Sequence, residues 1–267
     1  MPTVTVGDHY LYYETVGNPA SPPLLIISGL SDYTAKCAWQ VAGLAGDFFI
    51  VTFDNRGAGR SSPVPPGYSV ADMMDDAVAV LDALEISQAH VFGFSLGGMS
   101  ALHLALNHPE RIKRLVLGCT TAGGQLAVYP DELVIASLVQ PQLSGDPRDD
   151  FYSGLWMSVS DGSRREQPDL VDSLEKISMS NPQSAESYAA QIQALLSHDV
   201  ADHLAEIKTP TLVMHGEEDR MIPADNGRLL AEHIPGATLI TYPKAGHLFF
   251  IEQAEIVNRD IRRFLDT

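Results

Sequence analysis

The chain of 267 residues is acidic and has enough apolar residues for one large core. It carries 17 basic and 34 acidic side chains, for a formal net charge of −17, and 45% of its residues are hydrophobic. The charge argues against non-specific binding to nucleic acid or to an anionic membrane surface, since both attract basic faces. The length and composition are those of a single domain built on an open α/β sheet.

Cysteine usage and the N-terminal sequence favour a soluble, cytoplasmic protein. Cys37 and Cys119 lie far apart and form no C-x-x-C motif, so neither a disulfide framework nor a thiolate metal site is expected. We interpret Cys119, which follows an apolar strand, as a small core residue. The chain does not begin with a basic region and an apolar stretch, and no apolar run reaches the length of a membrane span. The sequence leaves open whether the protein is a monomer or a homodimer.

In chain order, apolar runs alternate with helical patterns, except in the middle of the chain. An opening β-hairpin is expected over residues 4–6 and 10–16. Further strands are expected at residues 24–27, 48–53, 89–94, 115–117, 211–215 and 238–242. Helices are expected at residues 35–44, 70–84, 96–107, 225–233 and 251–265. Ser69 and Asp72 form a capping box before the second of these helices. This alternation predicts βαβ units and a parallel sheet.

The alternation stops between residues 122 and 205, where no strand is expected. Helical patterns appear there at residues 132–139, 149–159, 170–179 and 184–196. The block leaves from the end of a strand and must therefore lie over the carboxyl edge of the sheet. We interpret residues 122–205 as a helical cap inserted into a core of residues 1–121 and 206–267.

The first chemical motif is Gly93-x-Ser95-x-Gly97, which stands between an expected strand and an expected helix. This spacing is typical of a nucleophile elbow, a turn so sharp that larger residues at the two flanking positions would collide. The turn holds the serine hydroxyl above the N-terminus of the next helix, where negative charge is stabilised. We therefore identify Ser95 as the candidate nucleophile.

A serine nucleophile needs a general base that lies at the carboxyl end of a strand. Most of the nine histidines lie on helices, in the first hairpin or at the wrong edge of the sheet. His215 ends a strand, but the turn that follows it carries a better-placed acid. His247 lies in the loop after the last strand and is the expected base.

The expected acid lies in the turn after residues 211–215. Glu217, Glu218 and Asp219 are adjacent there. Asp219 is preferred because the turn that begins at Gly216 brings the third residue back over the sheet, whereas the two glutamates are interpreted as solvated.

Two backbone N–H groups are expected to form an oxyanion hole. One belongs to Leu96, the residue after the nucleophile. The other comes from the turn at Ser28-Gly29, where the amide of Leu30 is the candidate and Gly29 allows the backbone to approach a substrate closely.

With these residues in place, the chain resembles the α/β-hydrolase superfamily over nearly its whole length. The motifs that carry the resemblance are Ser28-Gly29, Asp54-x-Arg56-Gly57-x-Gly59-x-Ser61, Gly93-x-Ser95-x-Gly97-Gly98, Gly216-x-x-Asp219-x-x-x-Pro223 and Gly246-His247. The resemblance implies a mostly parallel, eight-stranded α/β-hydrolase sheet with helices on both faces and an inserted helical cap. Within the superfamily, the chain is similar to small esterases, enol-lactonases and aminoacrylate hydrolases, which need no cofactor or metal.

One position departs from the family pattern. The family usually has His-Gly at the oxyanion turn, where this chain has Ser28-Gly29. That histidine supports the turn and is not itself a donor, so the departure does not exclude catalysis. Some aminoacrylate-hydrolase-like members also have Ser-Gly at this point.

The expected function is hydrolysis of a small-molecule carboxylic ester or lactone, of the EC 3.1.1 type. Ser95, His247 and Asp219 would act as nucleophile, base and orienting acid. Cleavage of a C–C or C–N bond uses the same residues and stays open. So does a receptor that reacts slowly or once, because plant hormone receptors resemble this fold with an intact triad.

The cap is expected to set specificity. Leu138, Tyr152 and Trp156, together with Gly29 in the core, are candidates for substrate binding. Packing of the cap onto the core explains the three cap residues equally well. Lys36, near the oxyanion turn, could bind a substrate carboxylate, although an exposed helical lysine usually has no such role.

Overall fold

The protein was analysed as a computed structural model, which describes residues 1–139 and 144–266. Within these residues, eight strands form one sheet in the order β1-β2-β4-β3-β5-β6-β7-β8. The strands are β1 (Thr3–Val6), β2 (His9–Val16), β3 (Pro23–Ile27), β4 (Phe49–Phe53), β5 (Ala89–Phe94), β6 (Ile112–Gly118), β7 (Thr211–Gly216) and β8 (Thr238–Tyr242). Only the pairs β1–β2 and β2–β4 are antiparallel. The expected mostly parallel, eight-stranded sheet is confirmed.

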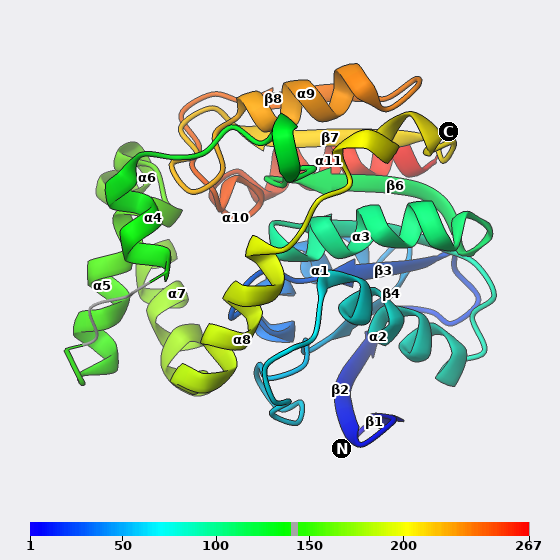
Figure 1. The fold of residues 1–267 in the computed structure, drawn as a ribbon, viewed down its shortest axis with the longest axis horizontal. Coiled ribbons are helices and arrows are strands. Elements are labelled where there is room, and N and C mark those ends of the chain that lie inside the picture. Colours follow the sequence, from blue (N-terminus) through cyan, green and yellow to red (C-terminus); the bar gives the residue numbers. More distant parts are fainter. Residues whose placement is uncertain (140–143, 267) are drawn as a thin grey trace.

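Helices cover both faces of this sheet (Figure 1). The core helices are α1 (Ala38–Leu44), α2 (Val70–Ala83), α3 (Leu96–Asn107), α9 (Asp225–His233), α10 (Phe249–Glu252) and α11 (Ala254–Leu265). The expected capping box of Ser69 and Asp72 starts α2. None of the helices in the described ranges is long and apolar enough to cross a membrane.

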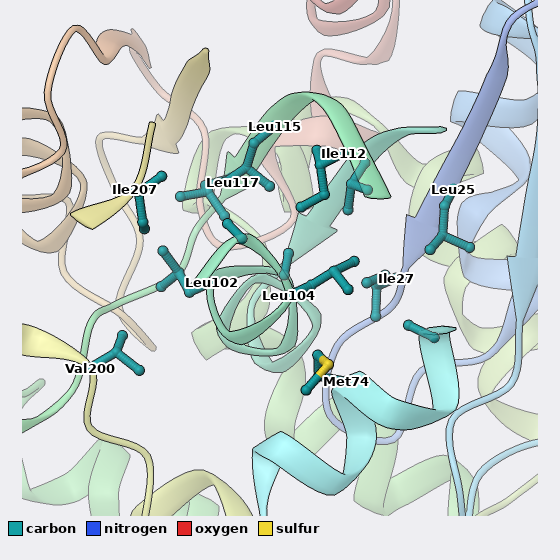
Figure 2. Close-up of a cluster of buried hydrophobic side chains, with 14 of the residues drawn as sticks. Leu25, Ile27, Met74, Leu102, Leu104, Ile112, Leu115, Leu117, Val200 and Ile207 are labelled. Atoms are coloured by element: carbon teal, nitrogen blue, oxygen red, sulfur yellow. The ribbon is translucent and has the colours of Figure 1, made fainter. Parts of the chain in front are cut away.

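The two faces of the sheet bury different side chains of the same strands, as the two-residue period of a strand requires. On one face, Leu25 and Ile27 of β3 belong to a buried cluster with Met74 of α2 and with Leu102 and Leu104 of α3. Figure 2 shows these side chains around α3. On the other face, the alternate β3 residues Leu24 and Ile26 pack in a cluster that includes residues of α1, α10 and α11. The first cluster packs α3, and with it the start of the elbow, onto the sheet.

Among the described residues between β6 and β7, the chain forms five α-helices: α4 (Glu132–Val139), α5 (Pro147–Ser158), α6 (Asp161–Glu166), α7 (Pro168–Ser180) and α8 (Ala185–Leu196). They gather at one side of the molecule, outside the stack of strands and core helices (Figure 1). The four helical patterns expected in this part of the chain are confirmed, and α6 is additional. Its six residues are too few to show a helical period, but the Ser160 side chain caps it by accepting from the Ser163 amide.

The closing helix differs from its expectation. Residues 251–265 read as one helix, but the structure has α10 and α11, separated at Gln253. The break accompanies a buried carboxylate, Glu252, whose oxygens accept hydrogen bonds from the amides of Gly246 at 2.8 Å and Ser160 at 3.1 Å. The spacing of apolar residues cannot reveal these hydrogen bonds. One donor, Ser160, lies far away in the sequence, and the other, Gly246, lies in the loop before the helix.

Candidate active site

Ser95 occupies the turn between β5 and α3 in a conformation that is rare for any residue but glycine. Its φ is 54° and its ψ is −125°. The backbone is fixed on both sides, because the Ser95 amide donates to Gly118 O at 2.9 Å and the Thr120 hydroxyl donates to Ser95 O at 2.8 Å. A strained serine held in this way at the carboxyl edge of a sheet is typical of a nucleophile elbow.

Glycine is required at positions 93 and 97, because a side chain has no room at either position. A Cβ at Gly93 would lie 2.3 Å from the carbonyl oxygen of Gly97, and one at Gly97 would lie 2.1 Å from that of Ile27. Both contacts are with backbone, which cannot move aside cheaply. The two positions therefore let strand, turn and helix approach each other more closely than any side chain would allow.

Asp219 and His247 meet beside this turn. Nδ1 of His247 lies 2.8 Å from Oδ2 of Asp219, and both side chains are almost completely buried. The other carboxylate oxygen of Asp219 accepts from the amides of Met221 and Ile222, each at 2.9 Å. These bonds fix the carboxylate, so the imidazole that it binds is held in one tautomer and orientation, with Nδ1 protonated.

The pKa values in this pair follow from mutual stabilisation. Burial alone would raise the pKa of Asp219, but His247 and His215 outweigh it and hold the pKa at about 2. Burial alone would lower the pKa of His247, but the Asp219 charge and hydrogen bond outweigh it and raise the pKa above 6.5. Asp32 and Glu252 add to this rise. The site is thus suited to stabilise an imidazolium that forms during a reaction.

His215 also belongs to this site, although sequence reasoning had set it aside. Its Nε2 atom lies 3.1 Å from Oδ2 of Asp219, and both side chains are fully buried. The position of His215 at the end of β7, four residues before the acid, was the only signal in the sequence.

The loop after β7, which carries Asp219, contacts both the loop with His247 and the inserted helices. A Cβ at Gly216 would lie 2.1 Å from the carbonyl oxygen of Gly246, so the two loops touch through their backbones. Arg220, next to the acid, binds Asp161 of α6 with two contacts at 3.0 Å and donates to Trp156 O at 2.8 Å. The turn that carries Asp219 is therefore held in place by hydrogen bonds to residues of the inserted helices α5 and α6.

The turn at Ser28-Gly29 lies against Ser95. A Cβ at Gly29 would be only 3.1 Å from Cβ of Ser95. Asn55 donates to Ser28 O at 2.8 Å, and the carboxamide oxygen of Gln191 in α8 accepts from the amide of Ser31 at 3.0 Å. Gln191 is fully buried, and its amide group also donates to Arg56 O at 3.0 Å. It is a second residue that sequence reasoning missed, because nothing local marks it.

The backbone N–H groups of Leu30 and Leu96, the two expected oxyanion donors, have no hydrogen-bond acceptor among residues 1–139 and 144–266. Leu96 is the first residue of α3, where an N–H has no partner within the helix.

A small cavity of about 80 Å³ opens on the nucleophile. It is lined by Leu30, Asp32, Lys36, Ser95, Ser158, Met221, His247 and Leu248. A larger cavity of about 300 Å³ lies beside the acid and is lined by Tyr129, Pro130, Asp131, Val134, Trp156, Asp219, Arg220 and Pro223. We take the smaller cavity as the candidate site, because Ser95 and His247 both line it.

The three cap candidates lie in different places. Trp156 lines the larger cavity. Tyr152 is 43% exposed and donates its hydroxyl proton to Glu175 at 2.6 Å. Leu138 accepts a hydrogen bond from the Tyr188 hydroxyl at its carbonyl oxygen. Neither Tyr152 nor Leu138 lines either of the two cavities.

Cys119 lies closer to this chemistry than its interpretation as a core residue suggested. One ligand atom each of Cys119, Asp219 and His247 lie within 4.8 Å of one another. A metal would need the Cys119 thiolate, but burial and the Asp219 charge raise the pKa of this thiol well above its usual range. Metal binding would also compete with the His247–Asp219 hydrogen bond. The set therefore fits a hydrogen-bonded pair better than a metal centre.

Comparison with known proteins gives concordant similarities. The sequence pattern of a family described as alpha/beta hydrolase fold matches residues 22–254. A putative carbamate hydrolase RutD of Caulobacter sp. (strain K31) is 32% identical over 96% of this chain and 95% of its own length. The 3-oxoadipate enol-lactonase 2 of Acinetobacter baylyi is 32% identical over 97% and 94%. The crystal structure of the enol-lactonase from Burkholderia xenovorans LB400 is 25% identical, covers 100% of both chains and superposes with a TM-score of 0.89.

Proposed function

The chain belongs to the alpha/beta hydrolase fold family, and we propose that it is a serine hydrolase that cleaves small carboxylic esters or lactones through an acyl-enzyme. The observation that carries the proposal is the convergence of three side chains. Ser95 and His247 line one small cavity, and Asp219 holds His247 from behind at 2.8 Å.

In the proposed reaction, the Ser95 hydroxyl attacks the substrate carbonyl while Nε2 of His247 takes its proton. The amides of Leu30 and Leu96 stabilise the oxyanion, a contribution of about 2.7–4 kcal/mol for one donor. His247 then protonates the leaving alkoxide and the C–O bond breaks. A water molecule, deprotonated by His247, cleaves the acyl-enzyme and releases the acid. Asp219 keeps His247 in the tautomer that these steps need.

Residues 122–205 act in this proposal as a cap over the core of residues 1–121 and 206–267. Two contacts support this role. Ser158 at the end of α5 lines the small cavity, and Gln191 of α8 binds the turn that carries the Leu30 amide. Movement of the cap would then change both the access of substrate and the position of an oxyanion donor.

The relatives support an acyl substrate with an oxygen or nitrogen leaving group. One is named as an enol-lactonase and the other as a putative carbamate hydrolase, each 32% identical. Both names denote attack at a carbonyl carbon, which is what the arrangement of Ser95, His247 and the two amides suits. A C–N bond is therefore the second candidate, and it is favoured by the similarity to the carbamate hydrolase.

The test is the release of nitrophenolate from p-nitrophenyl acetate with resolution of the pre-steady state. We expect a burst followed by sustained turnover, and a loss of several orders of magnitude in Ser95→Ala. Ser100→Ala is the matched control, because Ser100 lies on α3 just after the elbow and is buried without a hydrogen-bond partner in the described part of the chain. A Ser95→Ala variant with the wild-type rate would refute the proposal. A single stoichiometric burst without turnover would favour a receptor.

A further inference from the structure

A pair of opposite charges, Asp32 and Lys36, lines the small cavity together with the nucleophile. Nζ of Lys36 lies 3.5 Å from Oδ1 of Asp32, and their side chains are only 12% and 16% exposed. Removing both charges from water costs free energy that a loose contact repays poorly. Burial accordingly raises the pKa of Asp32. The position of the pair in the wall of the proposed active site suggests a role in binding.

The pair leaves hydrogen-bonding capacity unused. Charge-assisted hydrogen bonds between nitrogen and oxygen are normally about 2.7–2.9 Å long, so the contact at 3.5 Å is loose. In the described part of the chain, the Asp32 carboxylate has no other donor and the Lys36 ammonium has no other acceptor. An ammonium has three donors and a carboxylate accepts several hydrogen bonds. Both groups can therefore bind a ligand in the cavity without breaking another contact.

Asp32 also lies close to the reacting centre. The point where a Cβ of Gly29 would stand is 3.1 Å from Cβ of Ser95 and 3.2 Å from Oδ2 of Asp32. In addition, the Asp32 charge contributes to the raised pKa of His247. A substrate group that reaches Asp32 must therefore be attached within a few bonds of the carbonyl that Ser95 attacks.

The balance of charge selects the kind of group. A lone carboxylate on the substrate would be attracted by Lys36 but repelled by Asp32, and a lone ammonium would meet the reverse. A neutral group that presents an N–H donor beside a C=O acceptor satisfies both residues without adding net charge. A cis amide, as in a lactam ring, is the simplest such group, because a trans amide points its N–H and C=O in opposite directions.

We propose that Asp32 and Lys36 form a subsite for a cis amide close to the scissile bond, so that the preferred substrates are esters of lactam carboxylic acids. This inference rests on the proposed hydrolase function. Asp32 accepts the amide N–H, and Lys36 donates to the amide oxygen.

The experiment compares three p-nitrophenyl esters whose acyl chains differ in one group at a time. The 5-oxopyrrolidine-2-carboxylate has both N–H and C=O on one side of its ring, the 3-oxocyclopentanecarboxylate replaces N–H by CH₂, and the cyclopentanecarboxylate lacks the carbonyl as well. Each kcat/KM is divided by the rate constant of that ester with hydroxide, which removes differences in intrinsic reactivity. We expect each step down the series to lower the normalised value by about tenfold, as for one hydrogen bond to a charged group.

Variants assign the two steps to the two residues. Lys36→Met should abolish the preference for the 3-oxocyclopentanecarboxylate over the cyclopentanecarboxylate. The double variant Asp32→Leu/Lys36→Met, which leaves no unpaired buried charge, should abolish both preferences. The measured quantity is the ratio of kcat/KM between two substrates, so a loss of activity that is the same for both substrates does not affect it. The double variant Asp75→Leu/Lys113→Met removes an exposed acid and an exposed lysine elsewhere and should keep both preferences.

Three outcomes would overturn the subsite. Equal normalised values for the three esters in the wild type would show that the amide is not recognised. A markedly higher value for p-nitrophenyl hydrogen succinate would indicate a carboxylate subsite at Lys36 instead. Preferences that survive in the double variant Asp32→Leu/Lys36→Met would place recognition elsewhere.

Failure of the hydrolase function itself is distinguishable. If the wild type cleaves none of the esters, the proposed function fails, but binding still tests the subsite. Titration calorimetry of Ser95→Ala with methyl 5-oxopyrrolidine-2-carboxylate and with methyl 3-oxocyclopentanecarboxylate measures the N–H contribution without turnover. We expect about tenfold tighter binding of the amide, and equal affinities would refute the subsite.

Discussion

Nε2 of His215 lies 3.1 Å from Oδ2 of Asp219, the same oxygen that binds His247. Nε2 of His215 also lies 2.8 Å from the carbonyl oxygen of Ile222. Both neighbours are acceptors, so Nε2 must carry a proton and His215 is a donor. Within residues 1–139 and 144–266, Nδ1 of His215 is buried and has no hydrogen-bond partner. His215 and His247 therefore both hold the same carboxylate oxygen of Asp219.

We expect His215→Phe to lower kcat/KM by at least about tenfold, because a hydrogen bond to a charged group contributes about 1.5–3 kcal/mol. Without this donor, Asp219 is less stabilised and attracts the proton of His247 more strongly. The acid limb of the pH profile of kcat/KM should therefore move to higher pH, an effect that loss of packing alone would not produce. Phe fills the space of the ring, so a cavity does not complicate the result.

The matched control for this variant is His233→Phe, in which the exposed histidine at the end of α9 is replaced. It should leave both the rate and the pH profile as in the wild type. An unchanged acid limb in His215→Phe, with a lower melting temperature, would mean that His215 only packs the end of β7.

Sequence reasoning succeeded for the sheet, where the signal was local. The eight strands follow from apolar runs and from the alternating residues of the first hairpin. Ser95, Asp219 and His247 were predicted as a catalytic triad because each stands in a short motif at the end of a strand, and their catalytic role stays a prediction. The structure brings the last two into contact. Sequence reasoning did not single out His215, Gln191 or Asp32, because nothing in the local sequence around them indicates which groups they contact. Gln191 reaches Ser31, 160 residues away in the chain, and no pattern around position 191 records this contact.

Gly97 tests the close approach of the elbow to β3. In Gly97→Ala, the new Cβ would lie 2.1 Å from the carbonyl oxygen of Ile27, so strand and helix must separate. Overpacking of this kind costs about 1–3 kcal/mol or more. Because the separation also moves the Leu96 amide, activity should fall further than stability alone explains.

Urea unfolding and esterase assays measure the two effects in Gly97→Ala. Gly46→Ala is the control, since a Cβ at Gly46 meets no atom within 4 Å. A Gly97→Ala variant as stable and active as Gly46→Ala would contradict the packing described for the elbow.

Gln191 tests the link between α8 and the oxyanion turn. Gln191→Leu replaces the carboxamide by an apolar group and leaves the amide of Ser31 and the carbonyl of Arg56 without their partner. We expect a loss of about 1–3 kcal/mol in stability for a buried unsatisfied group. We also expect a lower kcat with little change in KM, because a mobile turn weakens the Leu30 donor mainly in the transition state.

Gln193→Leu is the control for this variant, because Gln193 lies on the same helix but is exposed. It should behave as the wild type in both unfolding and kinetics. If Gln191→Leu loses stability but keeps kcat, the link supports the fold and does not position the oxyanion donor.

The last prediction concerns pH. His247 must be neutral to act as a base, and its pKa is raised above 6.5, chiefly by Asp219, with a further contribution from Asp32. The wild-type kcat/KM should therefore fall as the pH drops through this raised pKa. Asp32→Asn removes a negative charge and leaves the Lys36 ammonium unpaired beside the site. Both changes disfavour the imidazolium, so the acid limb should move to lower pH, the direction opposite to that of His215→Phe.

The control for this variant is Asp75→Asn, at an exposed position of α2, which should leave the pH profile unchanged. A limb that stays in place in Asp32→Asn would mean that solvent screens Asp32 from His247, and that the cavity is wetter than its lining suggests.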